Sequence, residues 1–222
     1  VGCNRRGLAI SLPFPFLRDA LRIQRDVVFD GESVGDTFHL FDLLELDGED
    51  LRPLPLRQRL VELINVLASA QCPSFSMVHS AFSTADKTRL FEEIREGRRE
   101  GVVFKRLDAP YTPGRPNSGG PALKHKFTAT LSAVVDCLNA QRSVSLKLRG
   151  QKGWQSVGNV TIPVNQTIPQ PGDVVEVRYL YAFPDSGVLF QPVCLGMRTD
   201  VTAAECGTRQ LKFKPSDTDE DA

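Results

Sequence analysis

The sequence predicts an α+β domain followed by a smaller all-β domain. Up to about Phe127, segments with helical periodicity alternate with short apolar runs of strand type. From Leu131 onward, short strand-like runs are separated by turn residues, as in "PQPGD" and "PDSG". The change near Phe127 predicts one domain over 1–128, a second over 129–215, and an acidic disordered tail over 216–222.

The first domain is expected to hold strands, helices and one long loop. Asp26–Leu46 contains "DVVFDGE" and "FHLFDLLEL", which predict two strands joined by the loop Ser33–Thr37. "PLRQRLVELINVLASA" has apolar residues at helical spacing and predicts an amphipathic helix. "TADKTRLFEEIREGRREG" opens with a capping candidate at Ser83 or Thr84 and predicts a charged surface helix. "GVVFKRL" predicts a strand, and the Pro- and Gly-rich "DAPYTPGRPNSGGP" predicts a loop.

The second domain is expected to be a small barrel. Its strand candidates are "LSAVVDCL", "SVSLKLR", "QSVGNVTI", "DVVEVRYLYAF" and "LFQPVCLGM". Five strands within fewer than about a hundred residues are typical of an OB-fold. The sequence therefore predicts an all-β OB-fold after the α+β domain.

Composition excludes several classes of protein. Lys+Arg and Asp+Glu both number 27 in 222 residues, which argues against a wholly basic nucleic-acid wrapper but allows a local basic groove. The five cysteines and three histidines show neither zinc nor disulfide spacing, and reduced thiols are expected. There is no membrane span and no targeting signal, so a cytoplasmic protein, nucleoid-associated in a bacterial or viral setting, is expected. The start at Val-Gly-Cys suggests a chain that begins inside a domain.

Three short segments bear residues that could act chemically: "FDGES", "EGVVFKR" and "ALKHKF". Singly, each has an ordinary explanation: Glu32 as a turn carboxylate, Glu100 as an acid at a helix end, and Lys124 with Lys126 as a solvated strand face. Together they could form a nucleotide pocket. Carboxylates suit Mg²⁺, and lysines neutralise the charge that develops in phosphoryl transfer.

The order and wording of these segments resemble the ATP-dependent DNA ligases of the covalent nucleotidyltransferase superfamily. "DGE" at Asp30–Glu32 is similar to the third motif of that family. "FDLLELDGEDLRPLPLRQR" is similar to the segment that follows it, in which a Phe, here Phe41, packs on adenine. "EGVVFKR" resembles the fourth motif, so Glu32 and Glu100 are implied to serve the metal. The resemblance also implies an ATP-grasp-like adenylation domain with antiparallel sheets.

Two further segments extend the resemblance. "LKHKF" is similar to the fifth motif, whose lysines, here Lys124 and Lys126, contact the α-phosphate. "NRRG" is similar to the motif just after the nucleophile, which puts Arg5 in the place of its nucleotide-binding and catalytic arginine. The resemblance runs from Arg5 to about Lys214.

Two departures from the family pattern stand out. The family's nucleophilic lysine lies in a K-x-D-G motif, which is absent from this chain, and Arg5 and Arg6 cannot replace it because a guanidinium stays protonated. The sequence suggests an N-terminally truncated adenylation domain. The family's late Arg-x-Asp-Lys motif keeps Arg198, which is expected to bind nucleotide, but has Val201 in place of the lysine. Either of two later lysines, Lys212 or Lys214, is a candidate substitute.

The resemblance implies an enzyme that seals nicks in double-stranded DNA in repair, replication or recombination, acting as a monomer with ATP and Mg²⁺ or Mn²⁺. Between Arg95 and Lys126, eight Lys/Arg stand against three Asp/Glu, an excess that fits binding to a phosphate backbone. Two alternatives remain: an RNA ligase or capping-type nucleotidyltransferase, and a non-catalytic nucleic-acid-binding remnant. The missing lysine favours the remnant; the retained Glu and Lys motif residues argue against it.

Overall fold

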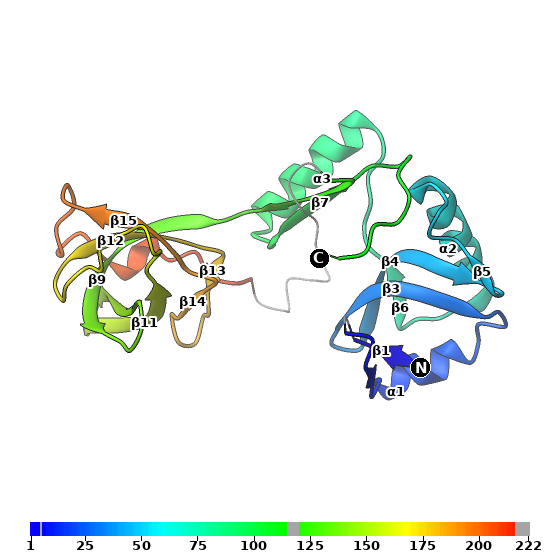
Figure 1. Cartoon of the computed structure of the whole chain (residues 1–222), viewed down its shortest axis with the longest axis horizontal. Coiled ribbons are helices and arrows are strands. Elements are labelled where there is room, and N and C mark those ends of the chain that lie inside the picture. The colour runs from blue at the N-terminus through cyan, green and yellow to red at the C-terminus, as the bar shows by residue number, and fades with distance from the viewer. Residues whose placement is uncertain (5, 115–119, 216–222) are drawn as a thin grey trace. The chain divides into compact units, whose positions relative to one another are not determined.

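The computed structural model describes residues 1–4, 6–114 and 120–215. The chain folds as two compact units, Val1–Ser83 with Val103–Lys124, and Thr84–Val102 with His125–Ala222 (Figure 1). The two-stranded ribbon of β7 (Gly101–Lys105) and β8 (Ala122–Lys126) has residues in both units. The domain bounds expected from sequence stay predictions, and the expected acidic tail at 216–222 lies outside the described residues. The mixture of helices with largely antiparallel sheets agrees with the expected α+β class.

The first unit is built on a four-stranded sheet. Strands β3 and β4 form an antiparallel hairpin, β5 continues it, and β6 pairs with β4 in parallel. The elements of this unit before the ribbon are β1 (Gly2–Cys3), β2 (Ala9–Ile10), α1 (Phe14–Ala20), β3 (Val27–Val34), β4 (Thr37–Leu46), β5 (Glu49–Asp50), α2 (Leu56–Ala70) and β6 (Phe75–Met77).

A tight turn and an apolar layer hold this sheet together. Asp47 and Gly48 join β4 to β5, and both have positive φ, +50° and +81°, the geometry that the Asp-Gly pair favours in two-residue hairpin loops. One face of β4 packs on α2. The shared core consists of Leu40, Leu43, Leu46, Leu51, Leu63 and Val66.

A buried ion pair links α2 to β4 within that layer. Asp42 and Arg59 have side chains only 3% and 2% exposed. The guanidinium donates from Nε and Nη2 to the two carboxylate oxygens at 2.8 and 2.7 Å, and Nη1 donates to the Leu54 carbonyl. Two charges removed from water this completely are tolerated only when each is fully hydrogen-bonded.

Helix α3 (Thr84–Glu96) precedes the ribbon formed by β7 (Gly101–Lys105) and β8 (Ala122–Lys126). The helix buries none of its residues, as expected for the charged segment. Its contact with β8 is aromatic: the Phe91 ring lies 5.5 Å from His125 and 5.0 Å from Phe127, between centroids.

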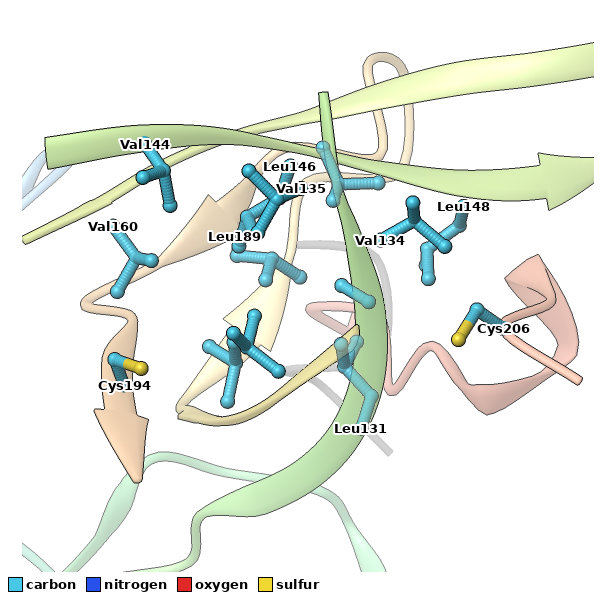
Figure 2. Close-up of a cluster of buried hydrophobic side chains, with 14 of the residues drawn as sticks. Leu131, Val134, Val135, Val144, Leu146, Leu148, Val160, Leu189, Cys194 and Cys206 are labelled. Carbon is cyan, nitrogen blue, oxygen red and sulfur yellow. The ribbon is translucent and has the colours of Figure 1, made fainter. Parts of the chain in front are cut away.

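The rest of the second unit is a five-stranded antiparallel sheet in the order β11-β10-β9-β12-β15, whose outer strands also contact each other. We call this part, 129–214, the barrel. Its inward side chains form one apolar core, part of which Figure 2 shows. The elements are β9 (Ala129–Leu138), β10 (Ser143–Gly150), β11 (Gly153–Thr161), β12 (Val174–Tyr179), β13 (Tyr181–Ala182), β14 (Leu189–Phe190), β15 (Val193–Arg198) and the 3₁₀ turn η1 (Thr208–Gln210).

The structure differs from the sequence expectations in two places. The run "DVVEVRYLYAF" is not one strand, because it breaks at Leu180 into β12 and β13, and "LFQPVCLGM" likewise divides into β14 and β15. No expectation was drawn from the sequence for the segment of helix α1, which contains Pro15 and directly follows Pro13. Both prolines lie at the start of the helix, where no intrahelical N–H is needed.

We predict that Arg59→Met destabilises the first unit by about 3–5 kcal/mol, because it leaves Asp42 buried and unpaired. Arg59→Met combined with Asp42→Leu should recover most of the loss. Hydrogen exchange of the β3 and β4 amides, measured at increasing urea concentrations, gives the free energy of unfolding of this unit separately.

The matched control is Arg52→Met, which breaks the exposed Arg52–Asp50 pair and should cost at most about 1 kcal/mol. Equal losses in the two single Arg variants would contradict a stabilising role specific to the buried pair.

Candidate functional site

Strands β7 and β8 approach each other closely at Gly101. A Cβ atom at this position would lie 2.0 Å from the carbonyl oxygen of His125, and φ is +155°. Only glycine fits at this position between α3 and the strand. The pairing is fixed on the Glu100 side by a hydrogen bond from the Phe127 N–H to the Glu100 carbonyl, at 2.9 Å. Glu100 therefore lies directly beside the end of the lysine-bearing strand.

The Glu100 side chain is exposed and interacts with the barrel. Its carboxylate lies near the phenol of Tyr181. Burial raises the pKa of Tyr181, and the negative charge of Glu100 raises it further, so the phenol stays protonated. The Tyr181 ring stacks on Phe190 with centroids 4.8 Å apart, which orients the hydroxyl.

The two lysines of β8 have different surroundings. Lys126 donates to the Oε1 atom of Gln191 at 2.6 Å. Gln191 has a φ of +53°, an uncommon conformation for a residue other than glycine. Lys124 is exposed. Since side chains alternate along a strand and His125 packs on Phe91, both lysines extend from the opposite side of β8.

Glu32 and Phe41 lie on the β3–β4 hairpin of the first unit. Glu32 is exposed and pairs with His39 across the hairpin. Phe41 is the extra residue of a β-bulge, because Asp30 and Gly31 pair with Asp42 and Leu40. Its ring has a cationic neighbour: the Lys105 ammonium lies 5.7 Å from the ring centroid and 3.4 Å from the Phe41 carbonyl oxygen.

Of the two arginines expected to bind nucleotide, the structure describes Arg198 but not Arg5. Arg198 is paired with Asp200 through two hydrogen bonds of 2.7 and 2.6 Å, and with Glu176 at 3.2 Å. The Asp200 carboxylate raises the pKa of Arg198, and the guanidinium lowers the pKa of Asp200 to about 2. The arginine and the aspartate of the Arg-x-Asp sequence thus form an ion pair with each other.

The predicted site residues fall into two groups. Glu100, Lys126 and Arg198 belong to the second unit, whereas Glu32, Phe41 and Lys124 belong to the first. Their convergence on one cleft stays a prediction. Sequence reasoning missed Tyr181 and Gln191 entirely, because nothing in their local pattern indicates contact with residues far away along the chain. The contact of Lys105 with Phe41 was not predicted either, although Lys105 lies within the motif "EGVVFKR".

Two general properties bear on the chemistry of this site. Within the described ranges, no group of three His, Cys, Asp or Glu side chains is arranged to hold a metal ion. A magnesium ion does not need such a cage, because it keeps several waters and takes one or two carboxylates together with substrate phosphates. None of the described helices has the length and apolar character needed to cross a bilayer.

Comparison with known proteins identifies relatives of this arrangement. The family model described as "ATP dependent DNA ligase domain" matches residues 9–126. The DNA ligase of Halorubrum lacusprofundi is 38% identical over 126 residues, covering 56% of this chain and 20% of that protein. A probable DNA ligase of Streptomyces coelicolor is 35% identical over 136 residues, covering 58% of this chain and 26% of that protein. The chain thus spans about a fifth to a quarter of these relatives.

A solved structure shares the fold. The crystal structure of the ligase domain from M. tuberculosis LigD is 22% identical, with a TM-score of 0.50, covering 92% of this chain and 84% of that one. At this level of identity the likeness concerns the fold alone.

We predict that Gly101→Ala disrupts the β7–β8 pairing, because the new methyl group would overlap the His125 carbonyl. Gly153→Ala is the matched control: it also has positive φ, +122°, but nothing lies within 4 Å of a Cβ atom there. The control measures backbone strain alone, roughly 1–3 kcal/mol. Hydrogen exchange at the Phe127 amide should accelerate strongly in Gly101→Ala and stay near wild type in Gly153→Ala. Similar exchange in both variants would mean that the pairing accommodates the added methyl group.

Proposed function

The chain belongs to the ATP-dependent DNA ligase family, and on that premise we propose that it forms part of an enzyme that seals nicks in double-stranded DNA. The family match over residues 9–126 carries this proposal, because that range contains Glu32, Phe41, Glu100, Lys124 and Lys126. Their chemical types suit a nucleotide with its metal ion. The proposed whole reaction has three steps. AMP passes from ATP to a lysine with release of pyrophosphate, and then from the lysine to the 5′-phosphate of the nick. The 3′-hydroxyl finally attacks that 5′-phosphate, which forms the phosphodiester bond and releases AMP.

We assign the metal to Glu32 and Glu100. Mg²⁺ or Mn²⁺ would supply a positive charge that neutralises phosphate oxygens as charge develops on them. Both carboxylates are exposed, so each is available to a hydrated ion. Glu100 lies near the Tyr181 phenol and can still accept a hydrogen bond from a metal-bound water, since a carboxylate accepts more than one hydrogen bond.

The nucleotide itself would contact aromatic and basic side chains. Phe41 is proposed to stack on adenine, with the Lys105 ammonium next to the Phe41 ring. Lys124 and Lys126 are proposed to bind the α-phosphate, which requires Lys126 to leave Gln191. A charged phosphate oxygen is a stronger acceptor than a neutral amide oxygen, so this exchange is favourable once the phosphate is in place.

The barrel is proposed to be an OB-fold that contacts DNA, with the domain bounds 1–128 and 129–215. Its strand order begins with a β9–β10–β11 meander, and the outward face of β10 and β11 is polar and basic. Lys147 lies 5.3 Å from the ring centroid of the half-exposed Trp154, and Arg149 pairs directly opposite Trp154. Such a combination suits phosphate contacts and stacking without base reading. We propose a monomer acting on nicked duplex DNA.

The first step needs the nucleophilic lysine of a K-x-D-G motif, and these 222 residues contain no such motif. Lys124 and Lys126 are assigned to the phosphate, which holds a lysine protonated. The third step differs from the first. AMP is then already on the DNA, so the nucleophilic lysine is not required.

We predict that the 222-residue chain takes up no label from ATP carrying a radioactive α-phosphate, yet slowly seals a nick adenylated beforehand in the presence of Mg²⁺. Denaturing gels measure both outcomes. Label retained on the protein would identify another nucleophile. Failure to seal the pre-adenylated nick, by a chain that is folded, would contradict the proposed function.

We predict that Glu100→Gln slows sealing of the pre-adenylated nick by at least about a hundredfold, because the amide cannot position the metal. Glu96→Gln, at the exposed end of α3, removes the same charge and should leave the rate unchanged. Far-UV circular dichroism checks that both variants fold. A Glu100→Gln rate equal to that of Glu96→Gln would remove Glu100 from the mechanism.

A further inference from the structure

The loop that follows β7 is anchored on the first turn of helix α2. The Leu56 N–H donates to the carbonyl oxygen of Ala109 at 3.0 Å. The Arg57 N–H donates to the carbonyl oxygen of Leu107, also at 3.0 Å. A helix leaves its first N–H groups without intrahelical acceptors, and α2 has no side-chain cap at this end. The loop supplies the missing acceptors from its backbone, so these contacts do not depend on its side chains.

Tyr111 extends from this loop to the β3–β4 hairpin. Its N–H donates to the Arg52 carbonyl at 2.8 Å, and its hydroxyl donates to the Oδ2 atom of Asp30 at 3.3 Å. Its ring centroid lies 5.9 Å from the guanidinium of Arg59, the buried partner of Asp42. Burial raises the pKa of Tyr111, and the negative charge of Asp30 raises it further. The phenol therefore stays protonated at neutral pH and remains a donor to Asp30.

Asp30 belongs to the β-bulge whose extra residue is Phe41. The strands are tightly packed here, because a Cβ atom at Gly31 would lie 2.5 Å from the carbonyl oxygen of His39. The extra residue of a bulge has no pairing partner on the opposite strand, so the surrounding contacts determine its direction. A group that holds Asp30 in place therefore also restrains the backbone from which the Phe41 ring extends.

The same segment contacts the bulge at a second point. Lys105 places its ammonium 3.4 Å from the Phe41 carbonyl oxygen and 5.7 Å from the centroid of its ring. Lys105 is exposed, whereas Tyr111 is half-buried. An exposed, flexible ammonium restrains its partner weakly, so the Tyr111 contact is the stronger of the two restraints.

We propose that Tyr111 is a positioning residue, whose hydroxyl orders the bulge through Asp30 and so orients the Phe41 ring for stacking on a nucleobase. Tyr111 acts through these two residues and does not itself touch the nucleotide. The inference rests on the proposed function, because it assumes that Phe41 stacks on adenine. It implies that binding of the base depends on Tyr111, whereas binding of the phosphates does not.

The first test compares binding of ATP, inorganic tripolyphosphate and 2-aminopurine riboside triphosphate to the chain in the presence of Mg²⁺. Tyr111→Phe removes the hydroxyl and keeps the ring. We expect affinity for ATP to fall about fivefold, as for the loss of one ordinary hydrogen bond, and affinity for tripolyphosphate to stay unchanged. Stacking quenches the fluorescence of 2-aminopurine, so quenching at saturation should also decrease. Unchanged quenching in Tyr111→Phe, or an equal loss for tripolyphosphate, would overturn the proposal.

The second test follows the route through Asp30. Hydrogen exchange at the Gly31 and Leu40 amides should accelerate in Tyr111→Phe, because the bulge loses a restraint. Asp30→Ala should lower ATP affinity to the same extent, and the double variant should be no worse than either single one, since both changes remove one contact. Asp30→Asn keeps an acceptor oxygen and should retain most of the affinity. Additive losses in the double variant would overturn the proposal.

Tyr179→Phe is the matched control. It also removes a phenol hydroxyl, which donates to the Gln210 carbonyl at 3.0 Å inside the barrel. Exchange at the bulge amides and quenching of 2-aminopurine should both stay at their wild-type values. Equal changes in the two Tyr variants would indicate a general loss of stability, and would overturn the specific role of Tyr111.

The wild-type chain separates this inference from the proposed function. Failure of the wild type to bind ATP would contradict the proposed function, and the inference would fall with it. Binding of ATP with the same affinity and quenching in wild type and Tyr111→Phe would overturn the inference alone. Faster exchange at the bulge without any loss of ATP affinity would also overturn it, because base binding would then not depend on the order of the bulge.

Discussion

The close approach of β7 to β8 at Gly101 is the constraint on which the candidate site depends. Because no side chain fits between Gly101 and the His125 carbonyl, the two backbones can pair without a gap. The pairing aligns the Glu100 carbonyl with the Phe127 N–H, and so fixes Glu100 beside the strand that bears the lysines. The Phe127 carbonyl, in turn, is the acceptor for Lys212. One glycine thereby determines the relative positions of residues far apart in sequence.

Two of the basic residues proposed to bind the nucleotide already have partners. Lys126 donates to Gln191, and Arg198 is bonded to Asp200. A ligand gains only the difference between the new hydrogen bonds and those it replaces, about 1 kcal/mol for a typical neutral pair and more for a charged one. A neutral acceptor such as the Gln191 amide is the easiest to displace. The doubly hydrogen-bonded Arg198–Asp200 pair is the hardest, so Arg198 contributes least to a ligand that does not also engage Asp200.

Local sequence patterns predicted most of the helices and strands. The features that were not predicted depend on contacts between residues far apart in the sequence. The strands at "DVVFDGE" and "FHLFDLLEL" and helices α2 and α3 follow from apolar periodicity, which is a property of neighbouring residues. The break at Leu180 does not follow, because it depends on how the barrel closes. The Glu100–Tyr181 contact joins residues 81 positions apart along the chain (181 minus 100), and no short motif encodes it. The same holds for Lys105 and Phe41, which meet only after β7 and β4 have formed.

The contrast between Val201 and Lys212 shows why a charge must be located in space before its role can be assigned. At position 201 the backbone directs the side chain toward an apolar core, where valine is stabilising and a lysine would be costly. Eleven residues later (212 minus 201), the chain runs along β13, and the hydroxyl of Tyr179 holds it there. A half-buried ammonium at that place pays a desolvation cost that one carbonyl acceptor does not recover.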